Sequence, residues 1–236
     1  MTAAVAPART RSAPLSVWGV ALLLPVGPAA IAELRLILPY YTASETPEIF
    51  AAVQADPGRQ SAVLWLGYLG VLTLVPGLFA AARVCRDGAP RLTAWALALS
   101  VPGYLSLGVL LSTDYLLWSV WDAGLTGADA DAVVSATHPT VNIAIGVFVF
   151  GHVIGTVLLG IAMLRSGRIP AWAAWAIAVS QPLHFIATVI LGSPQVDFVA
   201  WSLTALGMAV VARQLLREPT SPREDAEPRR FSGMAR

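Results

Sequence analysis

Two histidines, His152 and His184, lie near the middle of two long apolar segments of this chain of 236 residues. Imidazoles in such segments are informative, because polar groups deep in apolar helices usually face the protein interior or a cavity. Three kinds of chemistry suit the pair: ligation of a haem b, transfer of protons, and hydrogen bonds between neighbouring helices. No further spacing motif accompanies the histidines, so the sequence leaves the three open and predicts no other metal site.

Two carboxylates form a second candidate site. Glu33 lies inside an apolar run beside Arg35, and Asp114 follows a later apolar run. Two carboxyl groups can exchange protons with a substrate if a pocket opens between their segments. The alternative is ordinary charge near a loop, which suits Asp114 better than Glu33, since only Glu33 stands where a charge is expensive.

The composition places these side chains in a membrane protein. The chain is 56% hydrophobic and 12% charged, with a mean hydropathy of +0.68, whereas soluble domains carry roughly 25% charged residues. Runs long enough to cross a hydrocarbon core of about 30 Å recur through it. We expect an all-α polytopic bundle in residues 15–213, between a short N-terminal segment, 1–14, and a disordered tail, 214–236. Its six transmembrane helices are predicted at 15–38, 61–82, 92–111, 139–164, 171–191 and 196–212.

Several function classes are excluded by residue types. The basic residues are all arginines, so Schiff-base chemistry on lysine is ruled out. The single Cys85 rules out an internal disulfide and a cysteine-based zinc site. A formal net charge of +1 gives no reason to expect a nucleic-acid partner. The expected partner is a membrane lipid or a hydrophobic small molecule, with the oligomeric state left open.

The arginines predict an orientation. All of them except Arg35 and Arg59 fall on one side of the six predicted helices, together with both termini. The positive-inside rule then places the termini in the cytoplasm and the protein, as a multi-pass protein, in a bacterial plasma membrane. The first helix, with Pro25 and Pro28, has features of a signal peptide, but its apolar run continues to Leu38 and favours a retained, kinked helix.

An internal repeat relates two pairs of helices. The segments PRLTAWALALSVP (90–102) and PAWAAWAIAVSQP (170–182) share proline, tryptophan, serine and proline at the same spacing. The stretches 67–105 and 151–185 therefore read as tandem two-helix hairpins related by an axis along the membrane normal. The repeat pairs Tyr68 with His152 and Tyr104 with His184, and predicts a central pocket lined by Tyr68, Tyr104, Asn142, His152, Gln181 and His184.

The segments VLWLGYLGVLTLVPG, GHVIGTVLLGIAML and AVSQPLHF resemble uncharacterised integral membrane proteins of actinobacteria. That resemblance implies a fold and a location and no chemistry. In size the chain is also loosely similar to small membrane-bound terpene cyclases, which would give Glu33 and Asp114 the role of intramembrane acids. Whether the protein is an enzyme stays open. The expected function is binding of an apolar small molecule or lipid in the central pocket, in a transport or accessory role; the alternatives are a membrane enzyme acting on a lipid or isoprenoid and a bis-histidine haem protein.

Overall fold

The computed structural model describes residues 15–41 and 44–217, so the predicted segment 1–14 and residues 218–236 of the predicted tail lie outside the described residues. Within the described ranges, the regular structure is entirely helical, and six helical spans are long and apolar enough to cross a membrane. They are α1 (Leu15–Ile37), α3 (Pro57–Cys85), α4 (Pro90–Asp122), α6 (Thr140–Ser166), α7 (Ala171–Phe185) with its continuation η1 (Ile186–Leu191), and α8 (Pro194–Arg217). The predicted all-α, multi-pass architecture is confirmed.

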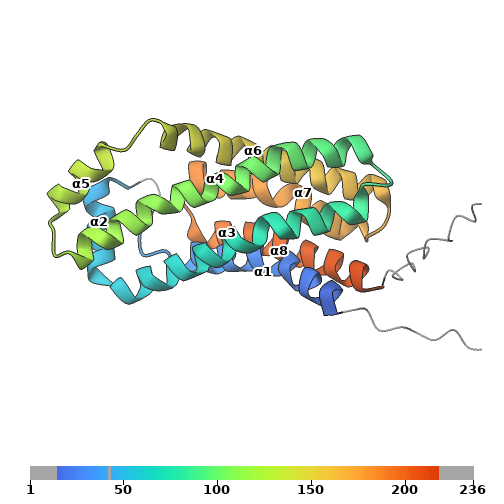
Figure 1. The fold of residues 1–236 in the computed structure, drawn as a ribbon, viewed down its shortest axis with the longest axis horizontal. Helices are drawn as coiled ribbons and strands as arrows, with labels where there is room; N and C mark the ends of the chain where they lie inside the picture. The colour runs from blue at the N-terminus through green and yellow to red at the C-terminus, as the bar shows by residue number, and fades with distance from the viewer. Residues whose placement is uncertain (1–14, 42–43, 218–236) are drawn as a thin grey trace, which may run out of the picture.

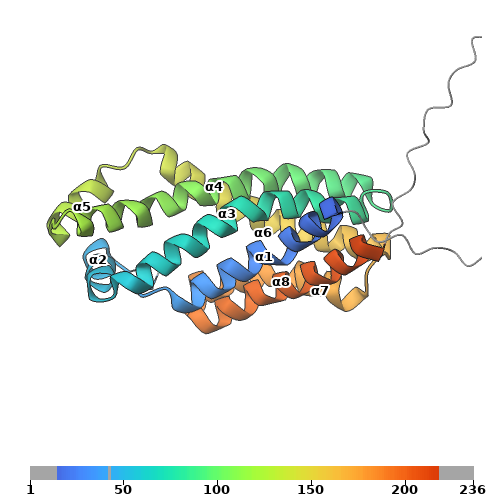
Figure 2. The same ribbon diagram turned by 60° about the horizontal axis from the view of Figure 1, so that its bottom comes forward.

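The six spans lie side by side along one long axis (Figures 1 and 2), and their contacts follow a closed ring. Along it, α1 packs on α3, α3 on α4, α4 on α6, α6 on α7 and α7 on α8, and α8 returns to α1. The first and last helices thus close the ring. The two predicted hairpins, α3–α4 and α6–α7, meet through α4 and α6, while their relation as an internal repeat stays a prediction.

Glycines bring α4 and α6 into backbone contact. A Cβ atom at Gly103 would lie 2.6 Å from the backbone nitrogen of His152, and one at Gly155 would lie 2.1 Å from Oγ of Ser100. Gly151 faces the carbonyl of Leu99 in the same way. Small residues four apart let membrane helices approach closely. Gly151 and Gly155 therefore form the part of the α6 surface on which α4 packs, directly beside His152.

Two short helices cover one end of the ring. At 1.5 Å per residue, α3 with 29 residues and α4 with 33 are about 44 and 50 Å long, more than a hydrocarbon core of about 30 Å needs. The helix predicted at 92–111 continues through residues 112–122, which extend α4. Against this extension pack α2 (Thr46–Ala55) and α5 (Gly127–Ser135), through a small apolar cluster of Phe50, Leu117, Val120 and Ala130.

Local signals explain where these helices begin. The Asp56–Pro57 pair follows α2 and starts α3, because the Asp56 side chain accepts a hydrogen bond from the backbone N–H of Arg59 at 2.9 Å. Thr126 and Asp129 form a capping box at the start of α5. Thr46 is not a cap, since Glu45 precedes the first turn of α2 without a side-chain hydrogen bond.

Two residues after His184, the fifth membrane-spanning segment changes from an α-helix to a π-helix. The sequence predicted one helix over 171–191, whereas residues 186–191 form a π-helix. Pro182 lacks a backbone N–H, and membrane helices adjust to such a loss through local π turns. The Tyr41 hydroxyl donates to the Thr188 carbonyl within this segment.

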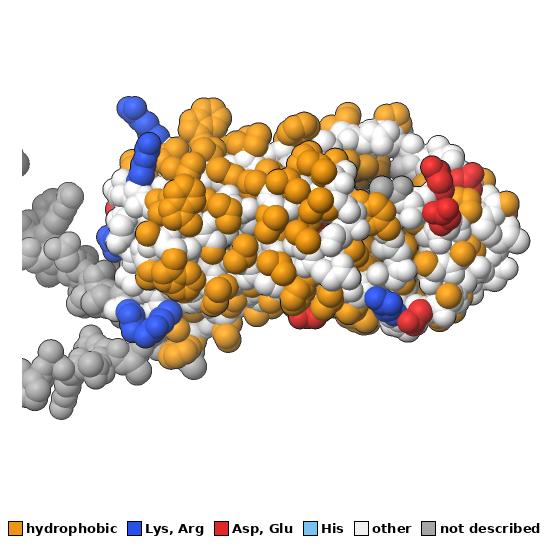
Figure 3. All heavy atoms as spheres, turned by 180° about the vertical axis from the view of Figure 1, so that it is seen from behind, with side chains coloured by type: hydrophobic (Ala, Val, Ile, Leu, Met, Phe, Trp, Pro, Cys, Tyr) orange, Lys and Arg blue, Asp and Glu red, His pale blue; other side chains and the backbone are white. Residues whose placement is uncertain are grey.

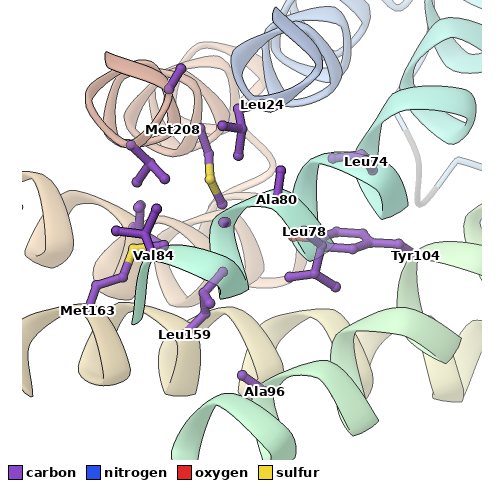
Figure 4. Packing of buried hydrophobic residues seen from close by; sticks show 14 of the residues in the cluster. Leu24, Leu74, Leu78, Ala80, Val84, Ala96, Tyr104, Leu159, Met163 and Met208 are labelled. Atoms are coloured by element: carbon purple, nitrogen blue, oxygen red, sulfur yellow. The ribbon is translucent and has the colours of Figure 1, made fainter. Parts of the chain in front are cut away.

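The core lies between the helices and the apolar surface lies outside them. Leu24, Leu78, Met163 and Met208 are among the buried side chains that fill the ring (Figure 4). Large apolar side chains also cover the outer wall, while charged groups gather toward the two ends (Figure 3). This is the surface expected of a protein whose sides face lipid.

Candidate functional site

A cavity of about 450 Å³ lies in the half of the ring that α2 covers. Its wall comes from α1, α4, α6, α7 with η1, and α8, together with Tyr40 and one residue of α2, Ile49. Most of the wall is aliphatic, with Leu107, Leu111 and Val149 as examples. Pockets for small molecules occupy about 300–1,000 Å³ and have mainly apolar walls with a few polar groups, so this cavity has the size and the lining of a binding site.

The inner end of the cavity is a cluster of rings from three helices. The rings of His152 and His184 lie 5.4 Å apart between centroids, and both are close to the indole of Trp201, at 6.1 Å and 5.5 Å. Phe148 stacks on His152 at 4.1 Å. The two histidines therefore meet in the protein interior as the sequence predicted, and both line the cavity.

A buried ion pair between Arg35 and Asp197 contacts this ring cluster through His184. Asp197, in the first turn of α8, is 1% exposed, and its Oδ2 atom accepts a hydrogen bond from Nε of Arg35 and one from the Thr188 hydroxyl at 3.2 Å. Its Oδ1 atom lies 2.5 Å from Nδ1 of His184. Burying a charge is costly unless it is paired and hydrogen-bonded, and these three partners from α1, η1 and α7 provide the compensation that Asp197 needs.

Three groups face a single nitrogen of His184. The Asp197 carboxylate lies 2.5 Å from Nδ1, the Trp201 indole nitrogen 3.2 Å and the Thr188 hydroxyl 3.3 Å. Because a carboxylate only accepts, the close contact with Asp197 places the hydrogen on Nδ1. His184 therefore donates to Asp197, and the indole N–H of Trp201 finds no acceptor at that atom.

His152 has a fixed tautomer. Its Nδ1 atom hydrogen-bonds to the backbone carbonyl of Phe148, and since a carbonyl only accepts, Nδ1 carries the hydrogen. In the neutral ring Nε2 is then an acceptor. This Nε2 atom is buried and faces the side-chain amide of Gln181, whose Oε1 atom is also buried. With its amide group turned over, Gln181 donates an N–H to Nε2. His152 is therefore held on both ring nitrogens by the protein.

A hydrogen bond between Tyr40 and Asp114, which we call the Tyr40–Asp114 latch, closes the outer end of the cavity. The Tyr40 hydroxyl donates to Oδ1 of Asp114, and the Gln60 side-chain amide approaches the same oxygen at 3.5 Å. Burial raises the pKa of Tyr40 far above its ordinary value of 10.0, and the negative charge of Asp114 raises it further. Tyr40 is therefore a neutral donor at any physiological pH and ties the α1–α2 connection to α4.

The predicted pair of carboxylates does not meet. Asp114 lines the cavity, but Glu33 is exposed on the outer side of α1. With 3.6 residues per turn, the face of α1 that lines the cavity carries Ile31, Leu34 and Arg35, which leaves Glu33 pointing away. The geometry proposed for a terpene-cyclase-like enzyme is absent from this site.

Of the other predicted lining residues, two are buried in the bundle and two are exposed on its surface. Tyr104 is buried, shares a hydrogen bond of 2.9 Å with Thr156, and has its ring 6.1 Å from His152. Gln181 is buried and shares a hydrogen bond of 2.9 Å with Thr204. Both lie behind the cavity wall. Tyr68 and Asn142 are exposed, and Tyr68 instead borders a surface groove with Trp65, Tyr115 and Trp118. Of the four side chains that the predicted repeat would relate, Tyr104, His152 and His184 lie near one another and Tyr68 does not.

The histidine pair does not fit the haem that the sequence left open. A haem held by both imidazoles would place its flat macrocycle between them, whereas the two rings lie directly against each other and His152 is stacked on Phe148. Nδ1 of His184 is also engaged by Asp197. Across the described residues, no group of three or more His, Cys, Asp or Glu side chains is arranged to hold a metal ion.

Sequence reasoning did not assign Arg35, Asp197 and Trp201 to the site. A signal for the first two was present, because an arginine inside an apolar run needs a partner in the protein interior. Asp197 begins the last predicted helix on the same side of the membrane, and Trp201 follows it by one helical turn. No pattern in the sequence singled out Asp197 from the other acids of that side.

Comparison with models of protein families, with curated proteins and with solved structures finds no match. The function is therefore argued from the geometry of the site. That geometry combines an apolar cavity with the buried Arg35–Asp197 ion pair and the histidine pair beside it.

Proposed function

We propose that this integral membrane protein binds an apolar small molecule or a membrane lipid in the cavity of about 450 Å³, in a transport or accessory role. The observation that carries the proposal is where the cavity opens. Three of its lining residues are also exposed on the outer wall: Ile145 of α6 (41%), Phe185 of α7 (38%) and Val189 of η1 (62%). They mark an opening between α6 and the π-helical segment, and within the described helices η1 contacts α7 and α8 but not α6.

This opening lies on the side wall, which is covered by large apolar side chains. The outer end, by contrast, is covered by Ile49 and by the Tyr40–Asp114 latch. A molecule dissolved in the bilayer therefore reaches the cavity without crossing water, whereas a water-soluble one meets the cap. Apolar surface gains about 25 cal/mol per Å² when it leaves water, but a ligand from lipid gains mainly by packing and polar contacts.

We also propose that the membrane is a bacterial plasma membrane and that both termini are cytoplasmic. Arg83, Arg86, Arg91 and Arg168 flank the α3–α4 and α6–α7 turns, at the end of the ring where α1 begins and α8 ends. The opposite end carries acids such as Asp129 and Asp131. The positive-inside rule supports this orientation. Alkaline phosphatase fused after Arg217 is expected to be inactive and a fluorescent protein there to be bright; the reverse would overturn the orientation.

Binding is tested on the purified protein by mass spectrometry of its organic extract and by labelling with a photoreactive lipid probe. Val149→Trp places an indole in the cavity and is expected to abolish labelling and remove any co-purifying molecule. Val147→Trp, on the same helix but outside the cavity lining, is the matched control and is expected to retain both. Equal labelling of the two variants at the native fold would overturn the proposal.

A further inference from the structure

We propose that the outer face of α6, at the end of the bundle where α6 ends and α7 begins, binds an anionic phospholipid by its head group. The site consists of two arginines, Arg91 and Arg165, and two tryptophans, Trp95 and Trp175, and we call it the Arg–Trp site. All four side chains are exposed, Trp95 by 65% and Trp175 by 55%. The site is separate from the cavity, whose lining includes none of the four, and it does not depend on the proposed function.

A stripe on α4 forms one border of the Arg–Trp site. Arg91, Trp95 and Leu99 follow one another at a spacing of four residues, so they lie along one face of the helix. This face borders α6, because the Leu99 carbonyl oxygen would lie 2.7 Å from a Cβ atom on Gly151. Arg91 and Trp95 therefore lie beside α6, in the first turns of α4.

The first turns of α7 form the other border. A Cβ atom on Gly160 of α6 would lie 2.7 Å from the Cβ atom of Ala178, so the two helices also pack closely. Trp175 precedes Ala178 by three residues and lies one turn from it on the same side of α7. Since its indole is exposed, it stands at the outer edge of the α6–α7 contact.

An apolar stripe that ends in a cation lies between these borders. Ile154, Leu158, Ile161 and Arg165 are spaced by four, three and four residues, which places them on one face of α6. Ile154 is 46% exposed and Arg165 is exposed, so this face points away from the bundle. The stripe therefore offers a lipid an apolar path for its acyl chains and a guanidinium at the level of its head group.

The indoles lie at the depth of the head-group layer. Trp95 is five residues past Pro90, about 8 Å along α4, and Trp175 is four residues past Ala171, about 6 Å along α7. The interfacial layer on each side of the hydrocarbon core is about 5–8 Å thick. Tryptophan prefers this layer, where its ring meets apolar groups and its N–H donates to polar ones.

The charge of this end favours an anion, and basic side chains stand there next to large apolar ones (Figure 3). Among the described residues, the acid of this end is Asp87, which lies 3.6 Å from Arg86 and 3.9 Å from Arg168. The ion pairs within the described residues do not include Arg91 or Arg165. A guanidinium matches two phosphate oxygens at once, and basic groups between membrane helices at this level bind anionic head groups.

The test is native mass spectrometry of the full chain in detergent, titrated with phosphatidylglycerol or with phosphatidylcholine of the same acyl chains. The wild type is expected to bind phosphatidylglycerol at least about tenfold more tightly, which corresponds to about 1.4 kcal/mol. The double variant Arg91→Gln, Arg165→Gln is expected to lose this preference. Equal affinity of the wild type for the two lipids would overturn the proposal.

A matched double variant separates the site from the general charge of this end. Arg83→Gln, Arg213→Gln removes the same charge from exposed positions on α3 and α8 and is expected to retain the preference. An equal loss in both double variants would overturn the site, because net charge alone would then attract the lipid. The cavity variant Val149→Trp is expected to keep the preference, so failure here and failure of the proposed function are distinguishable.

Two further measurements test the indoles and the source of the phosphate. Trp95→Leu, Trp175→Leu is expected to weaken the binding of both phospholipids, whereas Trp65→Leu, 71% exposed toward the opposite end, is expected to leave it unchanged. Unchanged affinity in the double variant would overturn the placement of the lipid between the indoles. Glycerol 3-phosphate is expected not to displace the lipid; displacement at equal concentration would assign the arginines to a soluble phosphate and overturn the lipid assignment.

Discussion

Arg35, near the end of α1, forms an ion pair with Asp197 in the first turn of α8, across 162 residues of sequence. The pair closes the ring between its first and last helices. Because Asp197 also holds His184 at 2.5 Å, the contact that closes the ring is the one that positions the inner end of the cavity. The stability of the bundle and the geometry of the site are therefore coupled through one carboxylate.

Asp197→Asn is expected to destabilise the protein. The substitution removes the charge that compensates Arg35, and breaking a buried pair from one side costs about 3–5 kcal/mol. A large fall in Tm during thermal unfolding in detergent is the readout. Asp87→Asn is the control, since its pair with Arg168 at 3.9 Å is exposed and exposed pairs contribute at most about 1 kcal/mol. Similar losses in both variants would contradict a structural role for Asp197.

Gly103→Ala is expected to separate α4 from α6. Its Cβ atom would lie 2.6 Å from the backbone nitrogen of His152, so the helices must move apart, at a cost of about 1–3 kcal/mol. Gly146→Ala provides the control on α6, because nothing lies within 4 Å of its added atom and alanine is the better helix former. The readout is Tm: Gly103→Ala should lower it and Gly146→Ala should not.

The Tyr104–Thr156 hydrogen bond is expected to show measurable coupling. A double-mutant cycle of Tyr104→Phe and Thr156→Val should give about 0.6 kcal/mol, the average for such bonds between membrane helices. Tyr68→Phe should leave the unfolding free energy unchanged, since Tyr68 is 50% exposed on the outer wall. An equal loss for Tyr68→Phe would contradict the placement of the two tyrosines.

Tyr40 is expected to resist ionisation in alkali. Its pKa is raised above the unfolded value of 10.0 by burial and by Asp114, so its contribution to stability is complete below pH 10 and is lost as the pH rises toward the folded-state pKa. Titration of tyrosinate absorbance should show ionisation of the buried tyrosines only with unfolding, and Tyr40→Phe should reduce the amplitude of that step by one tyrosine. An unchanged titration curve in that variant would refute the buried latch.

The opening between α6 and η1 is expected to control access to the cavity. Val189→Trp enlarges a residue at the opening and should slow labelling by the photoreactive lipid probe without changing Tm. Ile190→Trp is the matched control: it is the next residue, is 68% exposed, and does not line the cavity. Unchanged labelling rates in Val189→Trp would place the access route elsewhere.

The sequence by itself determined the helices, their number and their membrane setting. Runs of apolar residues long enough to span a bilayer, helix caps such as Thr126, and close-packing glycines such as Gly151 and Gly155 are local features, and local features are readable from order along the chain. The meeting of His152 and His184 was also within reach, because a polar group deep in an apolar helix turns toward protein.

Only the tertiary structure decided which face of each helix points inward. Gly67–Tyr68 and Gly151–His152 look alike in sequence, yet Tyr68 is exposed and His152 is buried. Glu33 and Arg35 are two residues apart, and Arg35 alone reaches the cavity. A helix that is apolar on all sides, as a membrane helix is, carries little amphipathic signal. Its orientation is therefore set by the neighbours it packs against, and those neighbours, as Arg35 and Asp197 demonstrate, can be at opposite ends of the chain.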